Sequence, residues 1–128
     1  MSEQRKIFKT EKAAITGGPY SQAIVHNGII YVSGQGAVNP KTNQIELGTV
    51  AHETRLAMQN LSIILEEAGS SLDKTLTITA YLLDMNDYAE FNKAYVSFFE
   101  GDLPTRTCIQ AAKLPFETKV EITATAFV

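Results

Sequence analysis

One segment of this 128-residue chain alternates apolar and polar residues without interruption, and it limits the possible folds more than any other feature. Between residues 75 and 82 the even positions hold Leu76, Ile78, Ala80 and Leu82, and the odd positions hold threonine or tyrosine. A period of two places the apolar side chains on one face of a β-strand. That face must be covered, because a sheet is stable only when its apolar side packs against other elements.

Two helices are predicted, one before and one after this strand. Residues 49–68 carry an apolar stripe at helical spacing, and Gly69 suits the end of that helix. A second helix is expected to begin near Asp87, with Glu90 completing a capping box, and to end at Gly101. The apolar stripe of the second helix consists of Tyr88, Phe91, Tyr95 and Phe98.

The remaining strands follow from alternation and from turn residues. Asn27-Gly28 predicts a two-residue hairpin, because both positions tolerate positive φ. Strands are expected at residues 6–9, 21–26, 29–33, 75–84, 105–112 and 119–127. The order β-β-β-α-β-α-β-β predicts an α+β fold, a single domain over residues 1–128 in which a mixed sheet carries both helices on one face. At this length roughly two-thirds of the unfolded surface can be buried, so a core is feasible without disulfides or metals.

The last two strands would form a candidate site if they paired as a hairpin. Arg106 and Cys108 share one face of the first strand, and Glu121 lies on the polar face of the second. A turn centred near residues 114–115 sets Cys108 opposite Glu121 and Arg106 opposite Thr123. The planar guanidinium of Arg106 can bind a carboxylate through two parallel hydrogen bonds. Glu121 can orient or deprotonate a water molecule.

The same spacing also has a purely structural interpretation. Arg106 and Glu121 can form an ion pair on a solvated sheet, and such pairs are common and contribute little to stability. Cys108 has no histidine within a few residues in the sequence, and a buried thiol usually behaves as a small hydrophobic group. Spacing alone therefore favours the structural interpretation.

Composition argues against several other classes of protein. The net charge is −3 and the 11 Lys and Arg residues are scattered, so no nucleic-acid surface is predicted. With 1 cysteine and 2 histidines at no close ligand spacing, neither a metal site nor a cofactor is predicted, and the lone thiol fits a reducing compartment. No apolar run approaches the ~20 residues of a membrane helix, and the first residues lack a signal peptide, so a cytoplasmic protein without membrane contact is expected.

Four segments of the chain carry a further pattern. They are Gly18-Pro19-Tyr20-Ser21-Gln22, Val32-Ser33-Gly34-Gln35, Asp84-Met85-Asn86-Asp87 with Asn92 and Tyr95, and Pro104-Thr105-Arg106-Thr107-Cys108 with Leu114-Pro115 and Val120-Glu121-Ile122. In this order they resemble the RidA/YjgF family of 2-iminobutanoate/2-iminopropanoate deaminases, over nearly the whole chain. Two positions depart from the family pattern. Thr107 stands where Ser or Ala is expected, and Gly36 stands where a larger aliphatic residue is usual, which widens the cleft.

The resemblance implies a chorismate-mutase-like α+β fold, a homotrimer and sites between subunits. It implies hydrolysis of reactive imine and enamine acids (2-aminoacrylate, 2-iminopropanoate, 2-iminobutanoate) to 2-keto acids and ammonia. In this family Arg106 would hold the substrate carboxylate and Glu121 would position or activate the water. The other implied contacts are the backbone at Gly34 and Cys108, a polar contact from Ser33, and Tyr20 and Asn92 from a neighbouring subunit.

Two other functions stay open. In a non-catalytic module Arg106 would capture a keto acid or similar carboxylate, but such a receptor gains nothing from the second negative charge of Glu121. An endoribonuclease or translation-inhibitor activity is also attached to the family, and the acidic charge balance argues against it. The preferred imine, and any regulatory protein partner, do not follow from the sequence.

Overall fold

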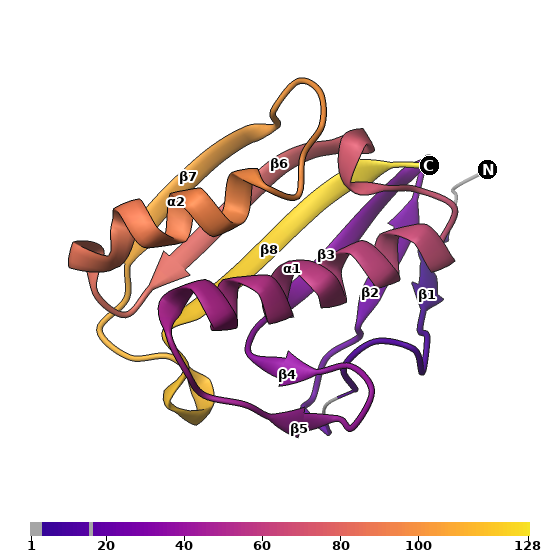
Figure 1. Cartoon of the computed structure of the whole chain (residues 1–128). Coiled ribbons are helices and arrows are strands. Elements are labelled where there is room, and N and C mark those ends of the chain that lie inside the picture. The colour runs from indigo at the N-terminus through magenta and orange to yellow at the C-terminus, as the bar shows by residue number, and fades with distance from the viewer. Residues whose placement is uncertain (1–3, 16) are drawn as a thin grey trace.

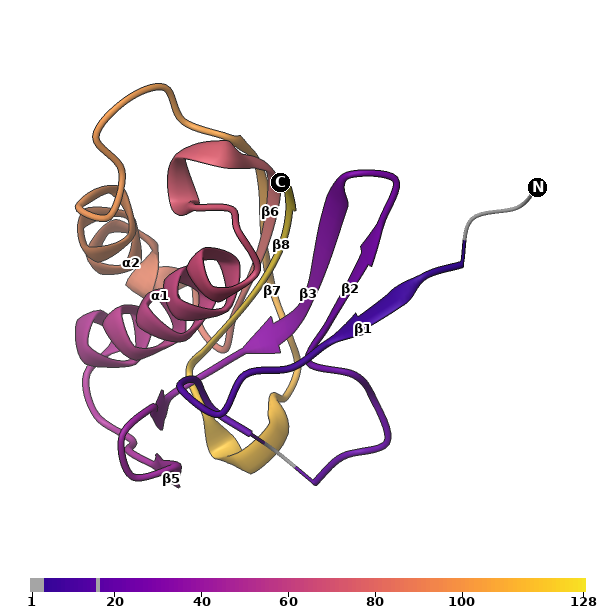
Figure 2. The same cartoon turned by 90° about the vertical axis from the view of Figure 1, so that its right-hand side faces the viewer.

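The structure, a computed structural model, describes residues 4–15 and 17–128. Within these residues six strands form one sheet in the order β1-β2-β3-β8-β6-β7, and two α-helices cover one of its faces (Figure 1). The strands of the sheet are β1 (Lys6–Phe8), β2 (Ala23–His26), β3 (Ile29–Gln35), β6 (Thr75–Leu82), β7 (Thr105–Gln110) and β8 (Val120–Phe127). The helices are α1 (Val50–Glu67) and α2 (Tyr88–Val96). Figure 2 shows both helices on the same side; no helix of the described residues lies over the opposite face, which we call the open face. The predicted α+β fold is confirmed.

Shorter elements lie between these. A two-stranded sheet of β4 (Val38–Asn39) and β5 (Gln44–Ile45) interrupts the segment between β3 and α1. Three 3₁₀ turns are η1 (Leu72–Lys74), η2 (Met85–Asp87) and η3 (Pro115–Glu117). No helix in the described part of the chain is both long and apolar enough to span a membrane.

The prediction for the first helix is confirmed. Thr49 is its N-cap, and its side chain accepts a hydrogen bond from the backbone N–H of His52 at 3.1 Å. The helix ends at Glu67, and Gly69 follows with φ of 91°, a conformation that glycine adopts without steric cost. Its apolar face packs on the sheet, so that Leu61, Ile64 and Leu65 are fully buried.

The second helix begins as predicted, with Asp87 as its N-cap residue and Tyr88 as its first residue, but the predicted capping box and the predicted end of the helix are wrong. Asp87 makes no side-chain capping bond to any described residue, and Glu90 does not complete a capping box. Glu90 Oε2 instead accepts a 2.9 Å hydrogen bond from the backbone N–H of Ala51, at the start of α1. The helix stops at Val96 rather than Gly101, because the backbone turns tighter there and Phe98 N–H bonds the carbonyl of Tyr95.

The predicted hairpin between the last two strands is also wrong. β6 lies between them, antiparallel to β8 and parallel to β7. Ile78 of β6 is the neighbour of Arg106 on one side and of Ala124 on the other. Alternation indicates only which face of a strand is covered, and the chain returns after β7 so that both edges of β6 are paired. The helix α2 makes the parallel crossover from β6 to β7.

Candidate functional site

The first part of the site is a bulge in β3 beside Glu121. β3 pairs regularly with β8 as far as Val32, and the register then shifts before Gln35. This irregularity contains Ser33 and Gly34 and brings the backbone close to the next strand. A Cβ at Gly34 would lie 2.8 Å from both Cδ and Oε2 of Glu121, so only glycine fits while the carboxylate keeps its place. The backbone of Gly34 and the carboxylate of Glu121 therefore lie in contact.

Glu121 opens into a cavity of about 490 Å³, which we call the Glu121 cavity. Its lining residues include Gly17, Gly18, Tyr20, Ser33, Gly34, Gly36, Val38, Ile45, Pro115, Phe116, Thr118 and Glu121. Burial raises the pKa of Glu121 above its ordinary value. A carboxylate with a raised pKa is a stronger base, so it is better suited to taking a proton from water.

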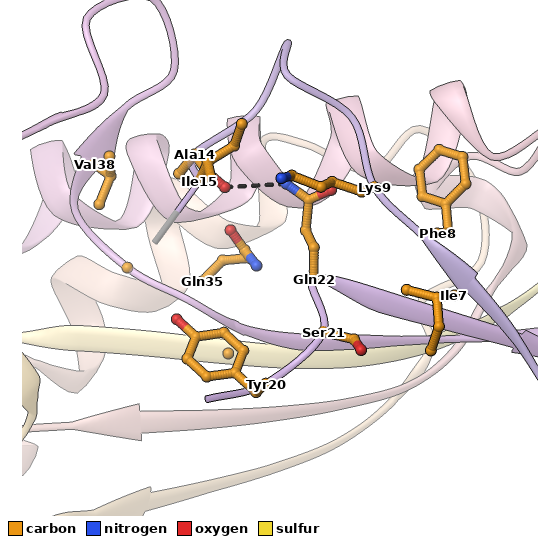
Figure 3. Close-up of a pocket in the computed structure, with 12 residues that line it drawn as sticks. Ile7, Phe8, Lys9, Ala14, Ile15, Tyr20, Ser21, Gln22, Gln35 and Val38 are labelled. Atoms are coloured by element: carbon orange, nitrogen blue, oxygen red, sulfur yellow. Dashed lines mark hydrogen bonds between the residues drawn. The ribbon is translucent and has the colours of Figure 1, made fainter. Parts of the chain in front are cut away.

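The loop before β2 is fixed by Gln22 and Ser33. Gln22 Oε1 accepts from the Thr10 N–H at 2.8 Å, and its Nε2 donates to the Ala14 carbonyl at 3.0 Å. Figure 3 shows the Gln22 side chain directed at the segment that carries Ala14, across a cavity of about 250 Å³. The Ser33 hydroxyl donates to the Ser21 carbonyl at 2.6 Å. These bonds place Tyr20, which lines both this cavity and the Glu121 cavity from the same chain. The resemblance implies a Tyr20 from a neighbouring subunit, whereas Tyr20 and Glu121 of one chain line the same cavity here.

Arg106 lies elsewhere, between the edge strand β7 and α2. Its Nη2 donates to the hydroxyl of Tyr88 at 2.9 Å. Its guanidinium carbon lies 5.5 Å from the ring centroids of Tyr88 and Phe91 and 5.0 Å from that of Tyr95. Contacts of a cation with three ring faces orient the guanidinium before any ligand arrives. We call Arg106 and these three rings the aromatic cage.

The cage borders a second cavity, of about 430 Å³, which we call the Arg106 cavity. It is lined by Asn92, Lys93, Tyr95, Val96, Leu103, Pro104 and Arg106. Asn92 Oδ1 and the Tyr95 hydroxyl are buried and have no hydrogen-bond partner within residues 4–15 and 17–128. Burial raises the pKa of Tyr95, so this hydroxyl keeps its proton. Unsatisfied buried polar atoms are rare in proteins, and they mark this cavity as a place for a polar ligand or a second chain.

Arg106 and Glu121 lie on opposite faces of the sheet. Arg106 is level with Ile78 of β6, and Glu121 is level with Tyr81. Because successive side chains of a strand point to opposite faces, Arg106 is on the helix face and Glu121 on the open face. The predicted cluster of Arg106, Cys108 and Glu121 is therefore wrong within one chain.

Cys108 belongs to the helix face as well. It is level with Ala80, and its side chain packs against the apolar core. Burial raises the pKa of the Cys108 thiol, and the positive charge of Arg106 opposes this only in part. The thiol is thus protonated at neutral pH, and the thiol is a far poorer nucleophile than the thiolate.

Sequence reasoning missed the aromatic cage and the apolar walls of the Glu121 cavity. The spacing of Tyr88, Phe91 and Tyr95 predicts the apolar stripe of a helix, but the two phenols on this stripe are a signal for a polar neighbour. Phe116 gave no signal, because nothing in its local sequence predicts the left-handed backbone that it adopts, with φ of 58°.

No three histidine, cysteine, aspartate or glutamate side chains gather as a metal site in the described ranges. The site thus consists of the Arg106 cavity, which has a fixed cation, and the Glu121 cavity, which has a half-buried carboxylate.

Comparison with known proteins gives consistent matches over almost the full chain. Residues 10–128 match the endoribonuclease L-PSP family. The chain is 41% identical to the 2-iminobutanoate/2-iminopropanoate deaminase of Mus musculus, over 95% of this chain and 90% of the relative. It is 37% identical to a RutC family protein of Pyrococcus horikoshii, over 96% and 98% of the two chains. The crystal structure of Escherichia coli TdcF with bound serine superposes with a TM-score of 0.90 at 36% identity, covering 96% of this chain and 98% of TdcF.

Proposed function

Because this chain belongs to the endoribonuclease L-PSP family, which is the RidA/YjgF family, we propose that it hydrolyses reactive 2-imino and enamine acids to 2-keto acids and ammonia. The presence in one chain of a preoriented guanidinium and a half-buried carboxylate of raised pKa carries this proposal. The first group suits the carboxylate that every such substrate has, and the second suits activation of water. The name of the mouse relative supports the same reaction.

The chemistry follows from these two groups. Arg106 binds the substrate carboxylate through parallel hydrogen bonds, in the orientation that the aromatic cage sets. Glu121 takes a proton from water as the water oxygen bonds to C2 of the imine. The proton then passes to the nitrogen to give a carbinolamine. The hydroxyl proton of the carbinolamine moves to the nitrogen as the C–N bond breaks, and a keto acid and ammonia leave. One water molecule is consumed, and no oxidant or reductant is required.

Both groups can act on one substrate only if two copies of the chain meet, since Arg106 and Glu121 face opposite sides of the sheet. We infer a homotrimer with sites between neighbours. One copy would contribute Tyr20, Ser33, Gly34 and Glu121, and the next would contribute Asn92 and Arg106. The open face supports assembly, because its Tyr31, Ile109 and Phe127 are 47%, 46% and 42% exposed.

Mixing two inactive variants tests this arrangement. Arg106→Ala and Glu121→Ala are expected to be inactive alone, in an assay that couples threonine dehydratase to the release of 2-oxobutanoate and ammonia. In mixed trimers about a quarter of the interfaces unite an intact Arg106 with an intact Glu121, so roughly a quarter of the activity should return. Light scattering should give a trimer for both variants. A mixture of folded trimers that stays inactive would place the complete site within one copy.

A second candidate is a non-catalytic receptor for amino or keto acids. It is favoured by the serine bound to TdcF, since serine carries the same carboxylate. The raised pKa of Glu121 ranks the hydrolase first, because a receptor has no use for a base. A ribonuclease ranks last, because a net charge of −3 gives no electrostatic attraction for RNA.

A further inference from the structure

The Glu121 cavity extends well beyond the groups that the reaction needs. Its volume of about 490 Å³ is within the range of roughly 300–1,000 Å³ typical of sites for drug-sized ligands. A small imino acid such as 2-iminopropanoate, with a methyl side chain, would leave much of the cavity of one copy unfilled. Unfilled apolar space forfeits dispersion contacts, so a small substrate would use the cavity poorly.

One part of the cavity wall is hydrocarbon. Val38 of β4, Ile45 of β5 and the pair Pro115-Phe116 of η3 line this part of the cavity. Ile45 is 41% exposed and Phe116 is 67% exposed, so both present uncovered apolar surface. An apolar ligand group would cover them, whereas a charged or strongly polar group would lose its water without gaining a hydrogen bond there.

The backbone of η3 holds Phe116 at the cavity. Phe116 and Glu117 have φ of 58° and 62°, so two successive residues other than glycine adopt the left-handed region. Residues persist in this region only when the surrounding structure over-determines them, and such strain concentrates at functional sites. The strained turn keeps a large aromatic side chain at the surface, where it forms a wall of the cavity.

Gly36 leaves the cavity open without being required by its backbone. A Cβ at Gly36 would meet the carbonyl oxygen of Val120 at 3.5 Å and Thr118 at 3.9 Å, which are ordinary contacts. Gly36 thus differs from Gly34, where a Cβ would clash with Glu121. A larger residue at position 36 is compatible with the fold and would occupy part of the cavity.

We propose that the apolar part of the Glu121 cavity is a subsite for the substrate side chain, and that the enzyme prefers 2-imino acids with bulky apolar side chains. The imines of leucine, methionine and phenylalanine belong to this class. The inference rests on the proposed deaminase function and adds its substrate class. Enzymes that oxidise amino acids to imino acids are the class of reaction that would supply these substrates.

The test measures imine hydrolysis with a matched series of amino acids. An L-amino-acid oxidase in the assay mixture forms the imines of alanine, leucine and phenylalanine. Semicarbazide traps any imine that is not hydrolysed. One added methylene in an apolar pocket changes kcat/KM by roughly 10- to 200-fold, so the leucine imine should exceed the alanine imine by at least ~10-fold.

Two variants and one control locate the preference. Gly36→Val fills the cavity and should lower the leucine-to-alanine ratio by at least ~10-fold, with Gly36→Ala as a milder form. Phe116→Ala removes a wall and should lower the ratio too. Gly101→Val is the control, because Gly101 is exposed, is not among the residues that line this cavity, and a Cβ there would have no described atom within 4 Å. Its ratio should equal that of the wild type.

The outcomes separate the two proposals. A protein that hydrolyses imines but prefers alanine, or whose ratio is the same in Gly36→Val, Gly36→Ala and Gly101→Val, has no such subsite, and the deaminase proposal survives. A wild-type protein that accelerates the hydrolysis of none of these imines overturns the proposed function and the subsite with it.

Discussion

The buried carboxylate of Glu53 accepts a 2.7 Å hydrogen bond from the backbone N–H of Lys119, the residue directly before β8. Its second oxygen accepts the N–H of Gly48 at 3.1 Å and lies 3.4 Å from Nζ of Lys119. Glu53 is fully buried, whereas the Lys119 side chain is 39% exposed. A helix side chain thus fixes the backbone two residues before Glu121.

Glu53→Gln should lower the free energy of unfolding by about 2–3 kcal/mol, because hydrogen bonds to a charged group are lost and one amide N–H must face another donor. Urea denaturation measures the loss. Glu67→Gln is the control, since Glu67 pairs with Lys12 at 3.5 Å on the surface and should change stability by less than about 0.5 kcal/mol. Equal effects of the two variants would show that the buried carboxylate contributes no more than a surface pair.

Arg106→Lys should lower kcat/KM by roughly 30- to 1,000-fold although the charge is kept. Lysine cannot form two parallel hydrogen bonds to a carboxylate, and its ammonium group does not match the cage of Tyr88, Phe91 and Tyr95. Steady-state kinetics with the coupled dehydratase provide the measurement, and Arg55→Lys, at an exposed position of α1, is the control. Near-normal turnover in Arg106→Lys would show that Arg106 acts only through its positive charge and not through two parallel hydrogen bonds.

Glu121→Gln should lower kcat by ~100- to 10,000-fold, the usual contribution of a positioned base. Binding of a product-like keto acid, measured by calorimetry, should stay the same or tighten slightly, because a negative charge near the ligand carboxylate is gone. Unchanged kcat would contradict the role of base. Lost binding together with unfolding would assign Glu121 a structural role.

The raised pKa of Glu121 also predicts how stability depends on pH. As pH rises past the ordinary glutamate pKa, the unfolded chain loses this proton while the folded chain retains it, so the free energy of unfolding falls. Above the pKa that Glu121 has in the folded protein, this loss in the free energy of unfolding no longer changes with pH. Glu121→Gln removes it, so the variant should gain stability relative to the wild type between pH 4 and pH 7. Urea titrations at both pH values and one fixed protein concentration test this, and a gain toward low pH would contradict it.

Cys108→Ala should keep kcat/KM within a few-fold of the wild type, because the partly buried thiol is protonated and the backbone at this position is unchanged. Loss of this small, partly buried group should cost about 1 kcal/mol of stability. A loss of turnover beyond ~100-fold with normal folding would show that the side chain takes part in the reaction.

The faces of the strands were predictable except at Leu76, which was expected on the covered face and is 42% exposed beside the register shift between Thr75 and Thr77. The neighbours of the strands were not predictable. Alternation correctly placed Ile78 and Ile122 in the core, because side-chain burial leaves a period of two in the sequence. The choice of partner depends on backbone hydrogen bonds, which any sequence can make. Nearness in sequence therefore favoured pairing β7 with β8, and the crossover through α2 left no comparable signal.

The same distinction applies to the site. The sequence pointed to Arg106 and Glu121 as the groups with useful chemistry, and the structure gives each a cavity. The sequence could not show that Arg106 and Glu121 face opposite sides of the sheet, because their relative orientation depends on which strand lies between β7 and β8. The bulge at Ser33 and the left-handed turn at Phe116 are likewise local responses to packing.

The central position of β8 has a consequence for synthesis of the protein. β8 joins β3 to β6, yet it is translated after every other strand in the described chain. A nascent chain that has not yet reached residue 120 can form only two separate pieces, β1-β2-β3 and β6-β7, each with an unpaired edge. Such edges are templates for aggregation, so ribosome-bound chains and premature stop products of this protein are expected to depend on chaperones until the last strand is made.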